Sequence, residues 1–391
     1  EDKINKTLSV TKDKFTEMKI GIVCYPTYGG SGVMATELGM GLAKKGHQIH
    51  FITYAQPTRL DFLSENLFYH EVSVKDYPLF DYPPYEIALA ARMVDVVEYE
   101  KLDLLHVHYA IPHASAAILA KQILATKGIT IPIITTLHGT DITLVGKEAT
   151  YASVVTYAIN QSDVVTAVSN SLKRDTHSLF DIQKEIKVIP NFVDIDKFKK
   201  QHKDHFKKAI CPNGEKLMVH VSNFRKVKRV QDVITVFCKV SQQIPVKLLL
   251  VGDGPERSEM EKMTRETCSI QDVRFLGKMS NVEEILSVCD VFIMTSEKES
   301  FGLAALEAMA CQVPLISTNV GGLTELNEDG VTGYTCDVGD IEDMVEKTLH
   351  VLHEDYLPKF KAEAYKKALS FELSQIMPMY EEAYEAACIT Q

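Results

Sequence analysis

The chain has 391 residues, 46% hydrophobic and 24% charged, which is typical of a globular protein large enough for two domains. Its formal net charge of -11 argues against nucleic-acid or anionic-membrane partners, because both need a broad basic surface. No apolar run reaches the roughly 20 residues of a membrane span, and the cysteines form no C-x-x-C pair. We therefore expect a cytoplasmic protein with buried thiols, and neither a disulfide framework nor a zinc site.

Residues 1–17 are polar and precede a clean apolar strand, so we interpret them as an extension outside the fold. From Met18 onwards, short β-branched runs alternate with longer helical ones. Strands are predicted at 18–25, 48–54, 102–109, 131–139 and 163–169, and helices at 32–46, 85–100 and 113–124. Because these strands are almost continuously apolar, we expect a parallel sheet covered by helices on both faces.

A turn at Pro190 and Asn191 interrupts the alternation, which then resumes. Strands follow at 216–222, 246–254, 272–278, 290–296 and 313–318, with helices at 229–240, 282–289, 302–310 and 371–388. We predict an α/β protein with two Rossmann-like, doubly wound parallel-sheet domains, 18–189 and 190–369, facing each other across a cleft. Residues 370–391 would form a C-terminal helix that packs back on the first domain. Open sheets bind ligands at the carboxyl ends of their strands, so the cleft should hold the site.

The segment EKESFGLAALEAMA, residues 297–310, joins a buried strand to an alanine-rich helix. Ser300 is a suitable N-cap, which would leave the amides of residues 301–303 free to bind an anion. Glu307 is the only charged residue in the helix, and a buried carboxylate is costly unless it is hydrogen-bonded. Sugar hydroxyls could supply donors to Glu299 and Glu307. A cationic partner for Glu307 and solvent around Glu299 would explain the pattern equally well.

A cluster of four cations follows the predicted strand at 216–222: Arg225, Lys226, Lys228 and Arg229. At the carboxyl end of a strand it would form a local phosphate site in an acidic protein. A solvated basic turn fits this pattern equally well when it is taken alone. The turn at 297–300 ends another strand of the same domain, which favours a ligand site.

Gly30, Ser31, Gly32 and Ala35 fit the G-x-G-x-x-A dinucleotide fingerprint, so an NADP-dependent oxidoreductase is an alternative function. The turn before the glycines is long, and no acidic residue ends the second strand to bind a ribose. Arg59 could instead contact a 2′-phosphate. In either case the glycines predict backbone amides that approach a ligand closely.

Four histidines in two short segments could be metal ligands: His106, His108, His113 and His138. No carboxylate lies at ligand spacing, so we favour packed or hydrogen-bonded histidines. The D-x-D segment Asp194–Asp196 is better explained by a turn and a helix cap than by a metal site. His138 differs from the other histidines, because it ends a strand beside a Gly-Thr-Asp turn, where a cleft residue would lie.

The combined motifs resemble family 4 glycosyltransferases of the GT-B fold. The resemblance rests on Glu299-x7-Glu307 followed by EAMACQVPLISTNVGGLTE, with VGDGPE, VKRVQDV, IPNFVD and GGSG, and covers nearly the whole chain after Met18. CYPTYGGSG, HVHYAIPHA, TTLHGTDIT and HVSNFRKVKRVQDV are similar to the branch that transfers N-acetylglucosamine from UDP-N-acetylglucosamine to L-malate, the first step of bacillithiol biosynthesis. This implies a hexosyltransferase that retains the α configuration and needs neither a metal nor a cofactor.

The resemblance also implies roles for the site residues. Glu299 would bind hydroxyls of the donor sugar, Glu307 the ribose and Lys228 the pyrophosphate, while His138 would reach the sugar near the reacting carbon. The catalytic candidates are His138, Arg225, Lys228 and Glu299. The donor-binding candidates are Gly30, Ser300, Phe301, Gly302, Leu303 and Glu307. The acceptor-binding candidates, which would face the malate carboxylates, are Ser31, Gly32, Arg59, Tyr109 and Thr140.

The chain departs from the family pattern at several positions. Asn223 stands where many members have a pyrophosphate arginine, and we expect Arg225 to substitute for it. Gln312 replaces a usual glycine, which would cost about 1 kcal/mol if that helix end needs a left-handed residue. Thr324 stands where proline is common.

A UDP-N-acetylglucosamine epimerase and a catalytically silent sugar-nucleotide sensor are further alternative functions. A homodimer is left open.

Overall fold

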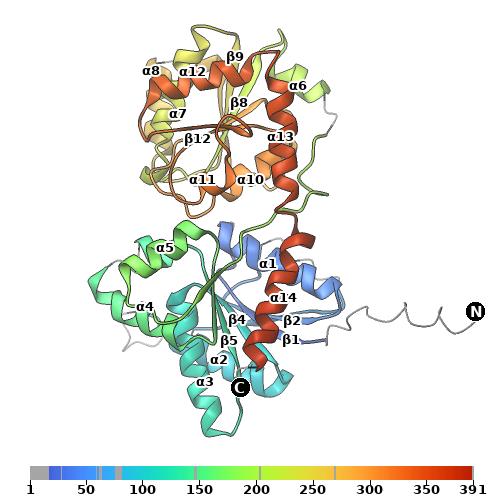
Figure 1. The fold of residues 1–391 in the computed structure, drawn as a ribbon, viewed down its shortest axis with the longest axis vertical. Coiled ribbons are helices and arrows are strands. Elements are labelled where there is room, and N and C mark those ends of the chain that lie inside the picture. The colour runs from blue at the N-terminus through green and yellow to red at the C-terminus, as the bar shows by residue number, and fades with distance from the viewer. Residues whose placement is uncertain are drawn as a thin grey trace, which may run out of the picture.

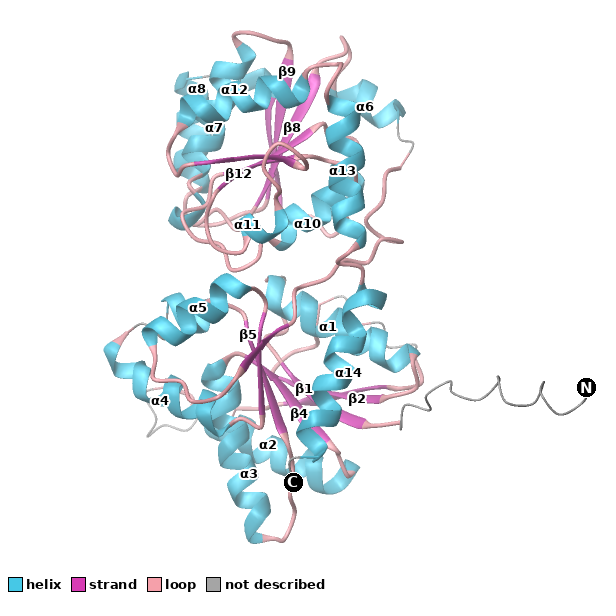
Figure 2. Cartoon of the chain, viewed as in Figure 1, coloured by secondary structure: helices cyan, strands magenta, loops and turns pink. Residues whose placement is uncertain are grey.

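The computed structural model describes residues 17–27, 29–58, 60, 64–74, 82–144, 148–201, 204–267 and 270–389. These residues fold into two α/β domains, each built around one parallel sheet (Figures 1 and 2). The predicted parallel α/β architecture is therefore confirmed. Arg59 and the extension up to residue 16 lie outside the described residues.

The N-terminal sheet has the strand order β3-β2-β1-β4-β5-β6-β7, and every neighbouring pair is parallel. Helices α1 (Gly30–Lys44) and α14 (Leu373–Ile389) share one core with the sheet, and α2 (Tyr85–Glu100) and α3 (Ser115–Thr126) share another. Helices α4 (Ala149–Gln161) and α5 (Asn170–Leu179) complete the domain. The strands are β1 (Lys19–Val23), β2 (Gln48–Thr53), β3 (Leu67–Glu71), β4 (Leu104–His108), β5 (Ile133–Leu137), β6 (Val164–Ala167) and β7 (Ile186–Val188).

The C-terminal sheet repeats this plan in the order β10-β9-β8-β11-β12-β13, again parallel throughout. One core contains α7 (Val230–Ser241), α8 (Arg257–Thr267) and α12 (Ile341–Leu352), and another contains α9 (Val282–Leu286) and α10 (Leu303–Ala310). The strands are β8 (Lys216–Val221), β9 (Val246–Val251), β10 (Val273–Gly277), β11 (Val291–Met294), β12 (Leu315–Thr318) and β13 (Gly333–Cys336). The remaining helices are α6 (Asp204–Ile210), α11 (Leu323–Leu326) and α13 (Leu357–Leu369).

Each sheet has one point where the strand order reverses, between β1 and β4 and between β8 and β11. The loops that follow the two strands at such a point leave the sheet toward opposite faces, and a crevice opens between them. At the first of these points, the Gly30–Gly32 segment follows β1 and Tyr109 follows β4. The second is followed by the basic turn after β8 and by Glu299 after β11.

The chain crosses between the domains twice, and the two crossing segments are hydrogen-bonded to each other. The Val193 amide donates to the Phe371 carbonyl (2.9 Å), and the Leu373 amide donates to the Val193 carbonyl (3.2 Å). Helix α14 then lies along the N-terminal domain (Figure 1). There Glu381, 2% exposed, pairs with Lys45 at 2.7 Å. The last helix is thus part of the N-terminal core.

The composition led us to expect buried thiols without disulfides, and no membrane span. Six of the cysteines that the structure describes are free thiols, five of them buried, as expected. Cys238 on α7 is disulfide-bonded, which the sequence analysis did not expect, because scattered spacing along a chain says nothing about distance in the fold. None of the described helices is both long and apolar enough to cross a lipid bilayer.

The end of α10 confirms the expected left-handed residue. Gln312 follows the last turn with φ 63°, a conformation that glycine adopts at no steric cost. We expect Gln312→Gly to raise the free energy of unfolding by about 1 kcal/mol, because it relieves this strain. Denaturant titration monitored by circular dichroism measures this change in the free energy of unfolding. Gln312→Ala keeps the Cβ and should bring no gain, so equal stabilisation by both variants would contradict the explanation.

Candidate functional site

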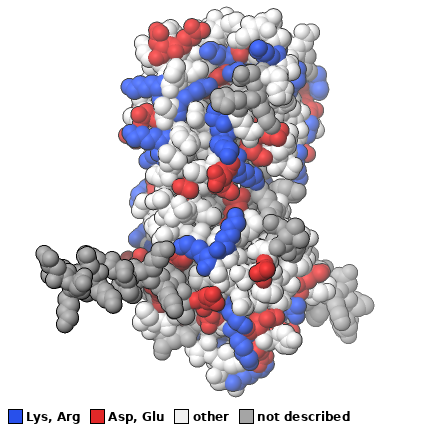
Figure 3. All heavy atoms as spheres, turned by 90° about the vertical axis from the view of Figure 1, so that its right-hand side faces the viewer, with Lys and Arg blue, Asp and Glu red and all other residues white. Residues whose placement is uncertain are grey.

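A cavity of about 420 Å³ lies between the two domains. Its N-terminal wall is built from the segment after β5 and from α5, and its C-terminal wall from the turns after β8, β11 and β12. Five candidates from the sequence analysis line it: Thr140, Arg225, Lys228, Glu299 and Ser300. On the face drawn in Figure 3, cationic and anionic side chains are interspersed.

The turns after β8 and β11 are bound to each other by hydrogen bonds. The Thr295 hydroxyl donates to the carbonyls of Lys228 and Arg229, at 2.9 Å each. The Glu297 amide donates to the Val227 carbonyl at 2.9 Å, and Arg229 pairs with the Glu297 carboxylate at 3.0 Å. These bonds fix the basic turn against the acidic one.

Lys228 and Glu299 form an ion pair at 2.5 Å at the cavity wall. Both side chains are largely buried, with 19% and 16% exposed. The Ser296 hydroxyl also approaches the Glu299 carboxylate, at 3.4 Å. A bound anion would have to draw Lys228 away from Glu299, which would free the Glu299 carboxylate to accept hydrogen bonds from a ligand.

The turn before α10 differs from the prediction. Ser300 is not the N-cap: the helix begins at Leu303, and Gly302 precedes it with φ 96° and no side-chain cap. Only glycine adopts that conformation readily, so the chain bends at Gly302 before the helix starts. The free helical amides therefore begin at Leu303, two residues later than a Ser300 cap would place them.

Three other donor-binding candidates do not line the cavity with their side chains. Phe301 is 3% exposed and packs edge-on against Phe371, with ring centroids 5.7 Å apart. Leu303 packs against the N-terminal core and lies next to Gly30. Glu307 is 8% exposed on α10, outside the cavity lining. For Phe301, only the backbone can therefore face a ligand.

The domains make two close contacts beside the cavity. Gly139 has φ 112°, and a Cβ there would lie 1.7 Å from the Ser300 hydroxyl oxygen, so only glycine permits this approach. Below it, the Glu325 carboxylate accepts hydrogen bonds from the amides of Asn170 (3.0 Å) and Ser171 (2.8 Å). A carboxylate of one domain thus caps helix α5 of the other, where it meets the positive end of the helix dipole.

His138 follows β5 beside this contact and is held by His108, whose Nδ1 lies 2.8 Å from His138 Nε2. Burial, and then the neighbouring His113, lowers the pKa of His138 to about 3. The imidazole is therefore neutral at pH 7 and can offer a hydrogen bond to a ligand without charge. His138 is half-buried and lies next to the cavity-lining Gly139 and Thr140.

Three acceptor-binding candidates come together in the N-terminal domain. The Tyr109 hydroxyl donates to the Ser31 hydroxyl at 2.7 Å, and Thr140 also bonds to Tyr109. Burial raises the pKa of Tyr109 to about 12, although these hydrogen bonds oppose the shift. Tyr109 is therefore a neutral donor at physiological pH. Thr140 lines the cavity directly, while Ser31 and Tyr109 lie behind it.

The glycines of the Gly30–Gly32 segment have a different role from the one predicted. The segment is the first turn of α1, not a loop before it. A Cβ on Gly32 would lie 2.2 Å from the Tyr25 carbonyl oxygen, so this glycine is needed where the loop after β1 passes close to the start of α1. The turn still offers free helical amides, because Gly29 provides no side-chain cap.

Two features of the site were missed by the sequence analysis. Helix α5 lines the cavity with Ser171, Leu172 and Asp175, but it was not among the predicted helices. Asp141 is buried and accepts hydrogen bonds from the amides of Gly139 (3.0 Å) and Ala110 (2.9 Å), which fixes the turn beyond β5. The Gly-Thr-Asp sequence indicates a turn here, and its aspartate could have been recognised as a residue that fixes that turn.

The expectation of hydrogen-bonded histidines is confirmed. His106 bonds to Tyr384 (2.9 Å) and Thr136 (2.7 Å), and His113 bonds to the His108 carbonyl. Within the described ranges, none of these four histidines lies in a group of side chains close enough together to hold a metal ion. The segment Asp194–Asp196 forms a turn, in which Asp194 accepts from the amide of Asp196 at 2.9 Å.

The contact of Gly139 with Ser300 generates a prediction about domain closure. We expect Gly139→Ala to force the domains apart, because its Cβ would overlap the Ser300 hydroxyl. Small-angle X-ray scattering should then show a larger radius of gyration. Gly128→Ala is the matched control: Gly128 also has positive φ (73°) but no atom within 4 Å of a Cβ, so it should lose only about 1 kcal/mol of stability. Equal scattering from both variants would contradict the role of Gly139.

Comparisons with known proteins agree in their assignment. Residues 28–197 match the family described as Glycosyltransferase Family 4, and residues 201–368 match Glycosyl transferases group 1. The chain is 47% identical over 371 residues to N-acetyl-alpha-D-glucosaminyl L-malate synthase of Bacillus anthracis, covering 94% of this chain and 97% of that protein.

Solved structures share the fold at low identity. HepE of Anabaena in complex with UDP-glucose superposes with a TM-score of 0.79 at 20% identity, covering 95% of this chain and all (100%) of that one. Sucrose-phosphate synthase of Thermosynechococcus elongatus gives 0.78 at 18% identity, covering 96% and 100%. These similarities establish the two-domain GT-B architecture.

Proposed function

Because the chain belongs to glycosyltransferase family 4, we propose that it transfers N-acetylglucosamine from UDP-N-acetylglucosamine to the hydroxyl of L-malate, the first step of bacillithiol biosynthesis. The observation that carries the proposal is the near full-length match, at 47% identity, to an N-acetylglucosaminyl L-malate synthase. The interdomain cavity supports it, since it combines cations for a diphosphate with a carboxylate for sugar hydroxyls.

The donor would lie along the C-terminal wall of the cavity. Arg225 and Lys228 are placed at the carboxyl end of β8, where guanidinium and ammonium groups can bind the two phosphates. Glu299 faces them and would accept hydrogen bonds from the sugar hydroxyls. The ribose role of Glu307 stays a prediction from the family resemblance, because this side chain lies outside the cavity lining. The free helical amides, which begin at Leu303, would face phosphate and sugar.

The reaction needs positive charge where the diphosphate leaves. We infer that the acceptor oxygen bonds to the anomeric carbon on the same face from which the diphosphate departs, so the α configuration is retained. The hydroxyl proton passes to the departing phosphate oxygen as the carbon–oxygen bond to phosphate breaks. Arg225, Lys228 and the start of α10 would stabilise the developing charge, so we expect transfer without a metal or another cofactor.

The acceptor would enter from the N-terminal wall. Neutral His138 would donate a hydrogen bond near the reacting carbon, and the hydroxyls of Tyr109 and Thr140 would approach malate. The first turn of α1, with Ser31 and Gly32, offers amides at a helix N-terminus for a carboxylate. Arg59 stays a predicted malate contact outside the described residues.

The NADP-dependent oxidoreductase is not supported by the structure. Gly32 is required by the close approach of the loop after β1, and β2 ends at Thr53, without an acidic residue for a ribose. The family match places the chain among transferases as well. An epimerase would convert UDP-N-acetylglucosamine without any acceptor. The experiment below distinguishes it from a transferase, because it compares the reaction with and without L-malate.

The decisive experiment measures UDP release from UDP-N-acetylglucosamine with and without L-malate, in EDTA, and identifies the product by mass spectrometry. We expect malate-dependent release and a product with the mass of N-acetylglucosaminyl malate. If UDP were released only with a different acceptor, the chain would still be a family 4 glycosyltransferase, but malate would not be its acceptor. No release with any sugar nucleotide would overturn the proposed function.

The ion pair of Lys228 and Glu299 predicts opposite effects on binding and on transfer. Glu299→Gln should bind UDP several-fold more tightly than the wild type, because Lys228 is released and a negative charge is removed beside the phosphates. Its kcat for transfer should fall about 100-fold, because an interaction with the reacting sugar is lost. Lys228→Met should weaken both. Isothermal titration calorimetry and the UDP-release assay give the two readouts.

Glu297→Gln is the matched control, since Glu297 pairs with Arg229 instead of Lys228. Its affinity for UDP should change less than that of Glu299→Gln. If Glu299→Gln bound UDP no more tightly than the wild type, the competition between Glu299 and phosphate for Lys228 would be disproved.

A further inference from the structure

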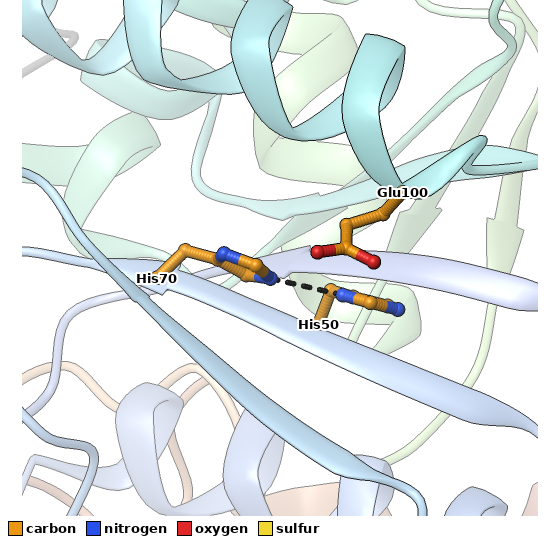
Figure 4. A group of neighbouring side chains, drawn as sticks. All are labelled: His50, His70 and Glu100. Carbon is orange, nitrogen blue, oxygen red and sulfur yellow. Dashed lines mark hydrogen bonds between the residues drawn. The ribbon is translucent and has the colours of Figure 1, made fainter.

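Two histidines and a glutamate converge at the β2–β3 edge of the N-terminal sheet (Figure 4). His50 lies on β2, His70 on the neighbouring strand β3, and Glu100 is the last residue of α2. One ligand atom from each residue lies within 4.8 Å of the other two. None of the three lines the interdomain cavity, and none was among the candidates from the sequence.

Strand pairing explains why the two rings meet. In the parallel ladder His70 is opposite Ile52, and Ile52 lies two residues after His50, so both histidines project from the same face of the sheet. Helix α2 covers that face, because Ile52 shares its core with α2. The histidine rings are stacked, with centroids 5.2 Å apart and planes at 16°. Figure 4 shows the Glu100 carboxylate reaching from the helix end toward both rings.

The protein does not use the full hydrogen-bonding capacity of this group. His50 is 1% exposed, and its Nδ1 lies 2.9 Å from His70 Nε2. Its buried Nε2 has no hydrogen-bond partner among the residues that the structure describes. Such an unsatisfied buried nitrogen is unfavourable. It is not the nitrogen that faces His70, so an ion shared by the two rings would bind His50 at Nδ1.

The hydrogen bond between the two rings places one proton between His50 Nδ1 and His70 Nε2. A cation bound to both nitrogens would shift that proton to the other nitrogen of one ring. Both facing nitrogens would then have a lone pair for coordination.

We propose that His50, His70 and Glu100 bind a divalent transition-metal ion, with Zn²⁺ the best fit. Two neutral imidazoles and one carboxylate form a ligand set of zinc sites that keep a fourth position for water. Bonds of about 2.1 Å in a tetrahedral site place two nitrogens roughly 3.4 Å apart, so the rings need to separate only slightly from their present 2.9 Å. His70 and Glu100 are half-buried, which leaves a path for the ion.

The ion would have a structural role. It would join the edge strand β3 to β2 and to the end of α2, and it would take no part in sugar transfer. Lys19 donates a hydrogen bond to the Glu100 carbonyl (3.0 Å) and, like Arg92, weakens the attraction of a dication. We therefore expect moderate affinity. The proposal does not depend on the proposed function.

The test uses the full-length protein, stripped with a chelator and exchanged into metal-free buffer. Titration with Zn²⁺ alone in a calorimeter should show one equivalent bound per chain and a higher Tm. Co²⁺ should give the visible ligand-field bands of a tetrahedral site. His70→Gln and Glu100→Gln should each bind Zn²⁺ at least roughly tenfold more weakly and lose the Tm increase.

Matched controls separate this site from other histidines and acids. Glu98→Gln removes the same charge from the same helix, but Glu98 pairs with Lys127 at 2.7 Å, so zinc binding should be unchanged. His205→Gln, at an exposed position on α6, and His138→Gln should also bind normally. The proposal is overturned if zinc does not bind, if folded His70→Gln and Glu100→Gln bind like the wild type, or if only His138→Gln loses binding.

Discussion

The cavity depends on how closely the backbone beyond β5 approaches the turn beyond β11. Gly139 and Ser300 meet there with no room for a Cβ, and this contact brings the strand ends of two separate sheets to one cavity. Each domain alone presents only half of the binding groups: cations and a carboxylate on one side, and imidazole and hydroxyl groups on the other. In the proposed reaction, transfer between two substrates would therefore depend on domain contact, because neither wall can surround the reacting atoms by itself.

Electrostatics at the cavity follow from the same arrangement. The protein is acidic overall, with a net charge of -11, yet Arg225 and Lys228 are concentrated at one strand end. In a partly buried setting, a cation acts more strongly on a phosphate than it would in bulk water. Glu299 pairs with Lys228 and thereby keeps the ammonium group from being buried without a partner. In the proposed function, a phosphate would replace Glu299 as the partner of Lys228.

Much of this organisation could be predicted from the sequence, because long apolar strands and amphipathic helices carry strong local patterns. The two parallel sheets, the basic turn and the Glu299 segment were all recognised in that way. The misses have physical reasons. Strand β3 is a sheet edge with Phe68 partly exposed, and β7 has only three residues, so neither shows a buried run. Ser300 is a good N-cap by residue type, but the left-handed Gly302 moves the helix start, and only backbone geometry shows this. The His50 group comes from three distant segments, which no spacing rule relates.

The two hydrogen-bonded crossings between the domains have a mechanical consequence. Because Val193 is bonded to Phe371 and Leu373, the outgoing and returning segments form one narrow ribbon instead of two independent tethers. The two hydrogen bonds keep the segments side by side and oppose sliding of one segment past the other. Opening of the enzyme should therefore follow a single arc, in which Ser300 leaves Gly139 and Glu325 leaves the start of α5 in a concerted movement. Each turnover would then return the same groups to the same positions, since the path offers few alternative ways for the domains to close.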